Sequence, residues 1–297
     1  MKSAIVIKQP FITIDAQQAP GDGILLSRHG IEVRTHDVVL RYFRIRIGDE
    51  DVRLDDPKVN YAGGDGDYAL YFTEGSRNAI ADHLSLSWST NKILSTTKMC
   101  DLITIQYCIL SEALNFSGHG YASLTGGNRV TWHHNLFAHN LSRNVRFQGP
   151  VAADFRNNVI YDWGHTAGYG EFDRLNYIGN YLKPGPSTTQ NPRRFHDGVA
   201  VVPPQSLYAA DNLIEGDDAV NQDNWKGMGY YALDRATLAA PAPFAAPRVT
   251  TEDPRTACER VLRTAGARLP VRDAADTRIV REVREGTGHI INRLRDL

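Results

Sequence analysis

Short apolar runs recur along the chain and are separated by polar or glycine-containing breaks. The runs FITI (11–14), DVVLRYFRI (37–45) and LITIQYCIL (102–110) are rich in β-branched and aromatic residues, and no helical period connects them. Strands of this length are not stable in isolation, because each buries too little apolar surface. The pattern therefore predicts many short strands that stack against one another.

One column of residues repeats through these runs. Aligning LITIQYCILSE, RVTWHHNLFAHN, ADFRNNVIYDW, LNYIGNYLKPG and LYAADNLIEG gives a column made of Cys108, Asn135, Asn158, Asn180 and Asn212, with gaps of 27, 23, 22 and 32 residues. The earlier segment AIADHLSLSW fits the same frame with Ser85 in the column. Asparagine tolerates a bend, and one amide per coil can exchange hydrogen bonds along a stack.

This period predicts an all-β solenoid over residues 1–240. The alternative is an antiparallel sandwich, which the scarcity of hairpin turns disfavours. After about residue 215 the pattern fades into the extended segment APAPFAAPRVTTEDP. Two helices should follow: one begins with Asp253 as N-cap, and one runs from about Asp273 to Glu285 and stops at Gly286. We expect residues 241–297 to dock on the solenoid as a strap with short helices, without forming an independent domain.

Composition narrows the function classes. Lysine and arginine total 33 against 34 aspartates and glutamates, which argues against the basic surface of a nucleic-acid-binding protein. No run approaches the roughly 20 apolar residues that cross a bilayer, so no membrane association is expected. The three cysteines have no metal-site spacing, and Cys100 and Cys108 are predicted to be buried.

No signal peptide is visible in the opening MKSAIVIKQPFITID. Three interpretations stay open: a cytoplasmic protein, the mature form of a secreted one, or a chain that begins inside its first structural unit.

Three clusters carry candidate chemistry. Asp65 and Asp67 in GGDGDYALYF (63–72) suit a calcium ion. A simple turn rich in glycine and aspartate would have the same sequence pattern. In HHNLFAHNLSRNVRFQG (133–149), Arg143 and Arg146 can clamp a carboxylate. The histidines of that segment, His133, His134 and His139, are expected to pack or hydrogen-bond without binding metal.

The third cluster, SGHGYASLTGG (117–127), contains His119 and Tyr121 one coil before Arg143. Stacked coils lie about 4.8 Å apart, so residues 20 to 30 positions apart become neighbours. The following residues should therefore share one groove: Asp65, Asp67, Asn91, His119, Tyr121, Arg143 and Arg146.

These segments resemble a known family. GDGDYALYF, DHLSLSWST (82–90), the Asn91-Lys92 pair, HHNLFAHN with SRNVRF, NNVIYDWG (157–164) and RDAADTRIVREVREGTGHI (272–290) are similar to the pectate lyases of polysaccharide lyase family 1. The resemblance covers about residues 10 to 290.

The resemblance implies a right-handed parallel β-helix that is secreted and cleaves polygalacturonate by β-elimination with calcium, and we expect a monomer. It implies that Arg143 is the base that removes the C5 proton of a uronate and that Arg146 contacts the substrate carboxylate. Asp65 and Asp67 match the first two calcium carboxylates of the family.

The chain departs from the family at three points. Further carboxylates of the family are replaced by Thr90, Asn91 and Lys92, so Asn91 would be a neutral ligand of a weaker calcium site. Lys92 is a candidate to contact the substrate carboxylate directly. A substrate-binding lysine of the family is absent, and Tyr121 and His119 lie near its place as substrate-binding candidates. The proline of the family's arginine segment is replaced by Val145.

Two other functions would fit parts of the sequence. A non-catalytic β-helix that binds polysaccharide or acts as an adhesin would explain the altered ligands, but the retained Arg143 speaks against it. A glycosidase needs paired carboxylates across the bond, and the central coils show no such pair beside Arg143.

Overall fold

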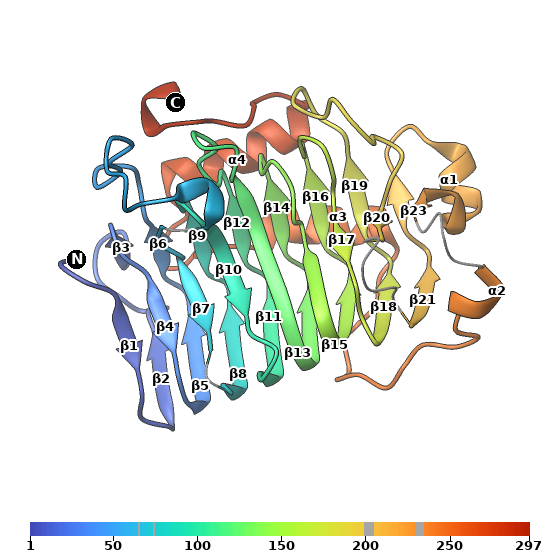
Figure 1. Cartoon of the computed structure of the whole chain (residues 1–297), viewed down its shortest axis with the longest axis horizontal. Helices are drawn as coiled ribbons and strands as arrows, with labels where there is room; N and C mark the ends of the chain where they lie inside the picture. Colours follow the sequence, from blue (N-terminus) through green and yellow to red (C-terminus); the bar gives the residue numbers. More distant parts are fainter. Residues whose placement is uncertain (65, 74, 199–204, 230–234) are drawn as a thin grey trace.

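Each coil of the chain contributes short strands that pair in parallel with the equivalent strands of the coils before and after it. The computed structural model describes residues 1–64, 66–73, 75–198, 205–229 and 235–297. Its coils stack from the N-terminus to the end that carries α1 (Asp218–Gln222) and α2 (Arg235–Leu238), as Figure 1 shows. The fold is a right-handed parallel β-helix, which confirms the predicted all-β solenoid.

The strands form three faces. The first face contains β1 (Ile5–Ile7), β4 (Ile31–Val33), β7 (Leu70–Phe72), β10 (Lys92–Thr96), the first parts of β13 (Tyr121–His133) and β15 (Arg146–Arg156), β17 (Tyr169–Gly170), β20 (His196–Asp197) and β23 (Met228–Gly229).

The second face is continuous with the first, because β13 and β15 run through both. It contains β2 (Ile12–Asp15), β5 (His36–Arg41), β8 (Arg77–Asp82), β11 (Asp101–Gln106), the later parts of β13 and β15, β18 (Arg174–Ile178) and β21 (Ser206–Ala210). The third face contains β3 (Leu25–Ser27), β6 (Arg44–Arg46), β9 (Ser85–Ser87), β12 (Ile109–Ser111), β14 (Leu136–Ala138), β16 (Val159–Tyr161), β19 (Tyr181–Lys183) and β22 (Leu213–Ile214).

Large apolar side chains fill the interior between the faces. The rings of Trp132 and Phe137 lie 5.7 Å apart, and Phe155 stacks on Tyr177 at 5.2 Å. These four side chains are at most 2% exposed. One continuous core therefore holds the coils together, as expected for a solenoid whose single repeats cannot bury their own apolar face.

The predicted asparagine column is a hydrogen-bonded ladder. The side-chain oxygen of Asn158 accepts from the backbone amide and the side-chain amide of Asn135, at 3.0 and 2.9 Å. The same pattern links Asn158 to Asn180 and Asn180 to Asn212. Asn224, which the alignment missed, extends the ladder by one step beyond Asn212, at 2.7 Å.

The placement of Ser85 in this column was wrong by one residue. Ser85 pairs with Ile109 on the third face, and the amide of Leu84 contacts the Cys108 sulfur. The column position at this coil therefore belongs to the buried residue Leu84. Ser85, the residue after Leu84, has the small polar side chain that the column predicts. A shift of one residue in a strand moves a side chain to the opposite face.

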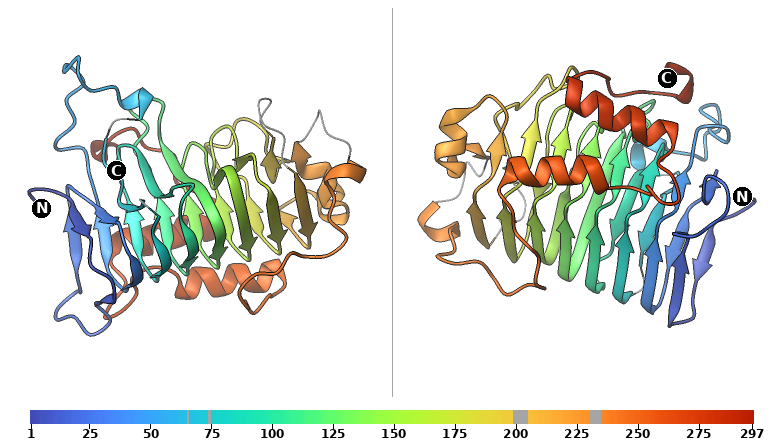
Figure 2. Two further views of the ribbon diagram at one scale, coloured as in Figure 1. Left: turned by 60° about the horizontal axis from the view of Figure 1, so that its bottom comes forward. Right: turned by 180° about the vertical axis from the view of Figure 1, so that it is seen from behind.

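The two predicted C-terminal helices cover the third face. They are α3 (Pro254–Thr264), whose N-cap is Asp253, and α4 (Ala274–Glu285), which ends at the left-handed Gly286. Val261 and Leu262 of α3 and Ile279 and Val283 of α4 belong to one apolar cluster with the strands beneath them. The right-hand view in Figure 2 shows both helices lying across these strands.

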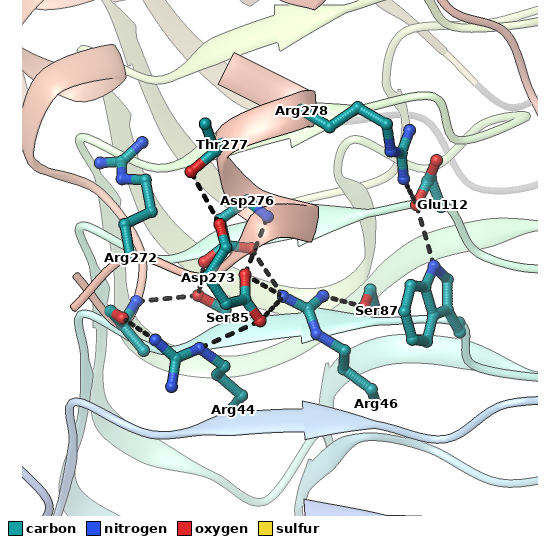
Figure 3. Close-up of polar contacts among 12 residues, drawn as sticks. Arg44, Arg46, Ser85, Ser87, Glu112, Arg272, Asp273, Asp276, Thr277 and Arg278 are labelled. Atoms are coloured by element: carbon teal, nitrogen blue, oxygen red, sulfur yellow. Dashed lines mark hydrogen bonds and ion pairs between the residues drawn. The ribbon is translucent and has the colours of Figure 1, made fainter. Parts of the chain in front are cut away.

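Buried charges fix the start of α4 on the third face (Figure 3). Arg46 Nη2 lies 2.8 Å from an oxygen of Asp273 and 3.0 Å from one of Asp276, and Arg44 Nε lies 3.2 Å from Asp273. Ser85 Oγ also donates to Asp276. Since a buried charge without its partner is strongly destabilising, this network fixes where α4 sits.

The cysteines agree with the expectation from composition. The three cysteines are free and buried, as expected for Cys100 and Cys108. In the part of the chain that is described, none of the helices is long and apolar enough to span a membrane.

The described residues also form three 3₁₀ segments: η1 (Tyr61–Gly63), η2 (Asn224–Gly227) and η3 (Leu294–Asp296).

Candidate active site

The candidate residues converge where β10, β13 and β15 begin on the first face. Lys92 pairs with Tyr121 across β10 and β13, and Tyr121 forms a bridge to Ser142, the residue before Arg143. Neighbouring coils therefore place Lys92, Tyr121 and Arg143 side by side, although 51 positions separate the first from the last. Figure 1 labels β10, β13 and β15, the strands at whose starts these residues lie.

Arg143 is held between two tyrosines. The carbon of its guanidinium lies 3.9 Å from the ring centre of Tyr121, and its Nε donates a hydrogen bond to the Tyr169 hydroxyl at 3.1 Å. A cation over an aromatic face is attracted by the negative potential of the ring. The backbone of Arg143 is left-handed, with φ of 63°, which is uncommon for a residue other than glycine.

Arg146 lies three residues after Arg143, at the start of β15. Its guanidinium carbon is 5.3 Å from the ring centre of Tyr169, so one tyrosine contacts both arginines. The Nε of Arg146 is buried and finds no hydrogen-bond partner within the described residues.

Lys92 is the third cation of this group and is only 7% exposed. Its Nζ donates to Asn91 Oδ1 at 2.6 Å and lies 3.5 Å from the Tyr68 hydroxyl. Burial, followed by the charges of Arg143 and Arg146, lowers the pKa of the Lys92 amine to about 8. The three cations are thus close enough to repel one another.

His119 packs against this group in its neutral form. Its ring lies 4.3 Å from that of Tyr121. Burial, then the charges of Lys92 and Arg143, lower the pKa of His119 to about 4. At neutral pH it can exchange a hydrogen bond with a ligand without adding charge.

The described residues do not assemble the expected calcium site. Asp65 lies outside the described residues. The Asp67 carboxylate is 2.9 Å from His29 Nδ1, and the side-chain oxygen of Asn91 accepts from the Lys92 ammonium. Within the described ranges, moreover, no three His, Cys, Asp or Glu residues are grouped as a metal site requires. An oxygen already bound to an ammonium is a poor ligand for a second cation, so Lys92 and Asn91 do not fit calcium.

The histidines of segment 133–149 have the structural roles expected of them. His134 stacks on Tyr107 at 4.9 Å. His139 Nδ1 contacts Asp162 at 2.7 Å inside the protein, and its Nε2 lies 3.3 Å from Glu282 of α4.

Three tyrosines of this region were not identified from the sequence. Tyr169 contacts both arginines, and Tyr68 stacks on Tyr71 at 4.6 Å beside Lys92. The only signal was positional: Tyr169 follows Arg146 by 23 residues, one coil length, and the two pair directly. Tyr68 and Tyr71 lie in the apolar run after Asp67, which gave no separate signal for either ring.

Comparison with proteins of known sequence places this geometry in context. The chain is 32% identical over 286 residues to a protein named Probable pectate lyase C from Neosartorya fischeri, an alignment covering 92% of this chain and 61% of that protein. A protein of the same name from Aspergillus flavus is 32% identical over 294 residues, covering 94% and 62%. The chain thus spans about three fifths of the length of these relatives. No protein-family model matches the chain.

Solved structures show the same fold. A pectate lyase bound to a hexasaccharide superimposes with a TM-score of 0.60 at 12% identity, over 86% of this chain and 69% of that chain. The major allergen from cedar pollen superimposes with a TM-score of 0.57 at 15% identity, over 89% and 78%.

Proposed function

We propose that this chain, a homologue of the pectate lyases that shares their β-helix, is a polysaccharide lyase acting on polygalacturonate or a related uronate polymer. The observation that carries the proposal is the group formed by Lys92, Arg143 and Arg146. The contacts of these cations are with tyrosines and an amide, and no carboxylate among the described residues neutralises them. Cations that no carboxylate neutralises are suited to bind the carboxylates of an acidic polymer.

The reaction is a β-elimination. A base takes the proton from C5 of a uronate, the electron pair of that bond forms a double bond between C4 and C5, and the bond from C4 to the linking oxygen breaks. The departing sugar takes a proton on that oxygen. The new end is an unsaturated uronate.

Arg143 is the base in this proposal. A guanidinium is normally protonated, so the role requires neighbouring cations that favour its neutral form. Lys92 and Arg146 are the cations beside Arg143, and burial, followed by the charges of Arg143 and Arg146, lowers the pKa of the Lys92 amine. The hydrogen bond from Nε to Tyr169 fixes the plane of the group.

Arg146 and Lys92 bind the substrate carboxylate and stabilise the negative charge that develops on it as the proton leaves. The Tyr121 ring packs against the Arg143 guanidinium, and neutral His119 beside it is assigned to hydrogen-bond a sugar hydroxyl. These roles keep the substrate-binding assignments made from the sequence.

We further propose that the Lys92 ammonium takes over part of the role that calcium has in the family. Its bond to Asn91 places a positive charge at the position where the sequence suggested a calcium ligand. No step of the reaction above is assigned to a metal ion.

The test is incubation of the protein with polygalacturonate, with and without a chelator, while the ultraviolet absorbance of the unsaturated product is followed. We expect absorbance to rise in both conditions, and Arg143→Ala to lower the rate at least about a thousandfold while the circular dichroism spectrum stays unchanged. Absence of product on all uronate polymers would refute the lyase and favour the binding-protein alternative. Loss of activity with chelator and its recovery on adding calcium would restore the calcium expectation, with Asp65 and Asp67 as the residues to mutate.

Extracellular action and a monomeric state remain proposals. A uronate polymer is too large to enter a cell intact, which supports action outside it.

A further inference from the structure

Two buried asparagines enclose the loop that carries Arg143. Asn140 is fully buried and Asn144 is 2% exposed, whereas Arg143 between them is partly exposed. The reaction described above assigns no role to either asparagine. Their hydrogen bonds show what they hold in place.

Asn140 is fixed to the preceding coil. Its side-chain oxygen accepts a hydrogen bond from the backbone amide of Ala113 at 3.0 Å, and its side-chain amide donates to the Leu110 carbonyl at 3.0 Å. Leu110 belongs to β12 and Ala113 follows that strand, so Asn140 has a fixed place one coil after β12.

The second hydrogen of the same amide joins the two asparagines. Asn140 Nδ2 donates to Asn144 Oδ1 at 3.2 Å, so one hydrogen bond spans the three residues between them, Arg143 among these. The backbone amide of Asn144 donates to the Ala167 carbonyl of the following coil at 2.8 Å. The loop is therefore tied to the coil before it at Asn140 and to the coil after it at Asn144.

The backbone of Arg143 needs such support. Its φ of 63° lies in the left-handed region, which a residue other than glycine keeps only where its surroundings determine it. The Arg143 carbonyl accepts from the Ser123 amide at 2.9 Å, which holds one side of the residue. The bond between the asparagines sets the distance that the loop must span, and so the direction in which the Arg143 side chain leaves it.

Stability alone does not explain Asn144. Its Nδ2 is buried and finds no hydrogen-bond partner among the described residues. A buried donor without a partner costs free energy, and an apolar side chain of similar size would avoid that cost. The contribution of Asn144 is the oxygen that accepts from Asn140.

We propose that the hydrogen bond between Asn140 and Asn144 positions Arg143 for proton abstraction from the uronate. Both asparagines act through Arg143, so they are positioning residues. Arg146 on β15 and Lys92 on β10 bind the carboxylate from strands outside this loop, so substrate binding does not depend on the bond. This role rests on the proposed lyase function.

Asn144→Ala tests the role, because it removes the accepting oxygen and keeps both bonds from Asn140 to the preceding coil. With polygalacturonate as substrate, kcat should fall at least about tenfold while KM changes less than about twofold. Asn140→Ala should give a similar loss in kcat. The double variant should lose no more than about twofold beyond either single variant, because all three break the same bond.

A second variant covers the case in which Asn144→Ala does not fold. Asn144→Leu fills a similar volume without an accepting oxygen, so it should show the same fall in kcat. Asn176→Ala is the matched control, because Asn176 is 1% exposed and binds the backbone of Phe244 at 2.9 Å on the second face. It removes a buried asparagine outside the loop and should leave kcat unchanged.

The outcomes separate this role from the function on which it rests. If the wild type is active and Asn144→Ala and Asn144→Leu lower kcat no more than Asn176→Ala does, the positioning role is overturned and the lyase stands. A loss confined to KM would assign the pair to substrate binding and would also overturn the role. Absence of product with the wild type on every uronate polymer overturns the lyase itself, and this role with it.

Discussion

Tyr169 is the residue on which the arrangement of the two arginines depends. It accepts a hydrogen bond from Arg143 and presents its ring to Arg146. It acts through the arginines, so it is a positioning residue.

Removing the hydroxyl tests this role. In Tyr169→Phe the ring stays and Arg143 loses the acceptor that fixes its plane, so kcat should fall about tenfold while KM changes less than about twofold. Steady-state rates on polygalacturonate measure both parameters. Tyr208→Phe, on β21 of the second face, is the matched control. An unchanged kcat in Tyr169→Phe would show that the bond does not position Arg143.

Lys92 predicts the pH dependence of the reaction. The pKa of its amine is about 8 in the free protein, so the ammonium that binds the substrate carboxylate is lost as the pH rises through that value. Because kcat/KM reports groups of the free enzyme, it should fall above about pH 8, approaching tenfold per pH unit.

Lys92→Arg is the conservative control for this prediction. A guanidinium stays protonated, so the fall at high pH should disappear while activity at neutral pH is largely kept. A rate that rises through pH 8 in the wild type and depends on Lys92 would contradict the binding role and point to the lysine as the base.

At the scale of elements, α4 is attached to the third face by a buried histidine as well as by the arginines of Figure 3. His139 is fully buried between Asp162 and Glu282. Burial alone would lower its pKa, but the two carboxylates outweigh burial and raise the pKa to about 8. Glu112 adds to this effect, and the Tyr161 ring packs edge-on against the imidazole.

The sign of the pH effect follows from this raised pKa. The stabilisation is complete below the unfolded-state pKa near 6.5 and is lost as the pH rises through about 8. The difference of 1.5 pKa units corresponds to about 2 kcal/mol in the free energy of unfolding. The lowered pKa of Glu282 acts in the acid range instead, where its contribution is lost as the pH falls.

Urea unfolding at about pH 6 and about pH 9 measures the effect. His139→Gln should lose most of the pH-dependent difference, whereas His289→Gln, at an exposed position near the C-terminus, should retain it. Comparing each variant with the wild type removes contributions from other groups such as Lys92. An equal pH dependence in wild type and His139→Gln would refute the assignment.

The elements themselves were largely predictable because their signals are local. The caps of α3 and α4 at Asp253, Asp273 and Gly286 lie where the sequence places them. The ion pairs that hold α4 were not predictable. Arg46 and Asp276 are 230 residues apart, and no local pattern in either segment indicates the other residue.

At the scale of the whole molecule, the asparagine ladder joins successive coils. Asn158 is fully buried, accepts from Asn135 and donates to the Trp132 carbonyl at 3.0 Å. Its removal leaves buried donors and an acceptor without partners, each costing about 1–3 kcal/mol.

Asn158→Ala should therefore lower the free energy of unfolding by about 3 kcal/mol or more, measured by urea denaturation. Asn128→Ala, at an exposed asparagine of β13, is the matched control and should change it by less than about 0.5 kcal/mol. Equal effects of the two substitutions would show that the ladder does not stabilise the stack.

The sequence by itself determined the coil period, the asparagine column from Asn135 to Asn212 and the C-terminal helices, because each follows from a local pattern or a fixed spacing. Only the tertiary structure determined which side chains of different coils contact one another. Register between coils places Tyr169 against Arg143 and Leu124 beside Arg146, and it gives Asn91's oxygen to Lys92. Spacing predicted that Asp67 and Asn91 would share a groove, but the direction of each side chain depends on neighbours from other coils. His29 and Lys92 are those neighbours, and they are why Asp67 and Asn91 contact other groups.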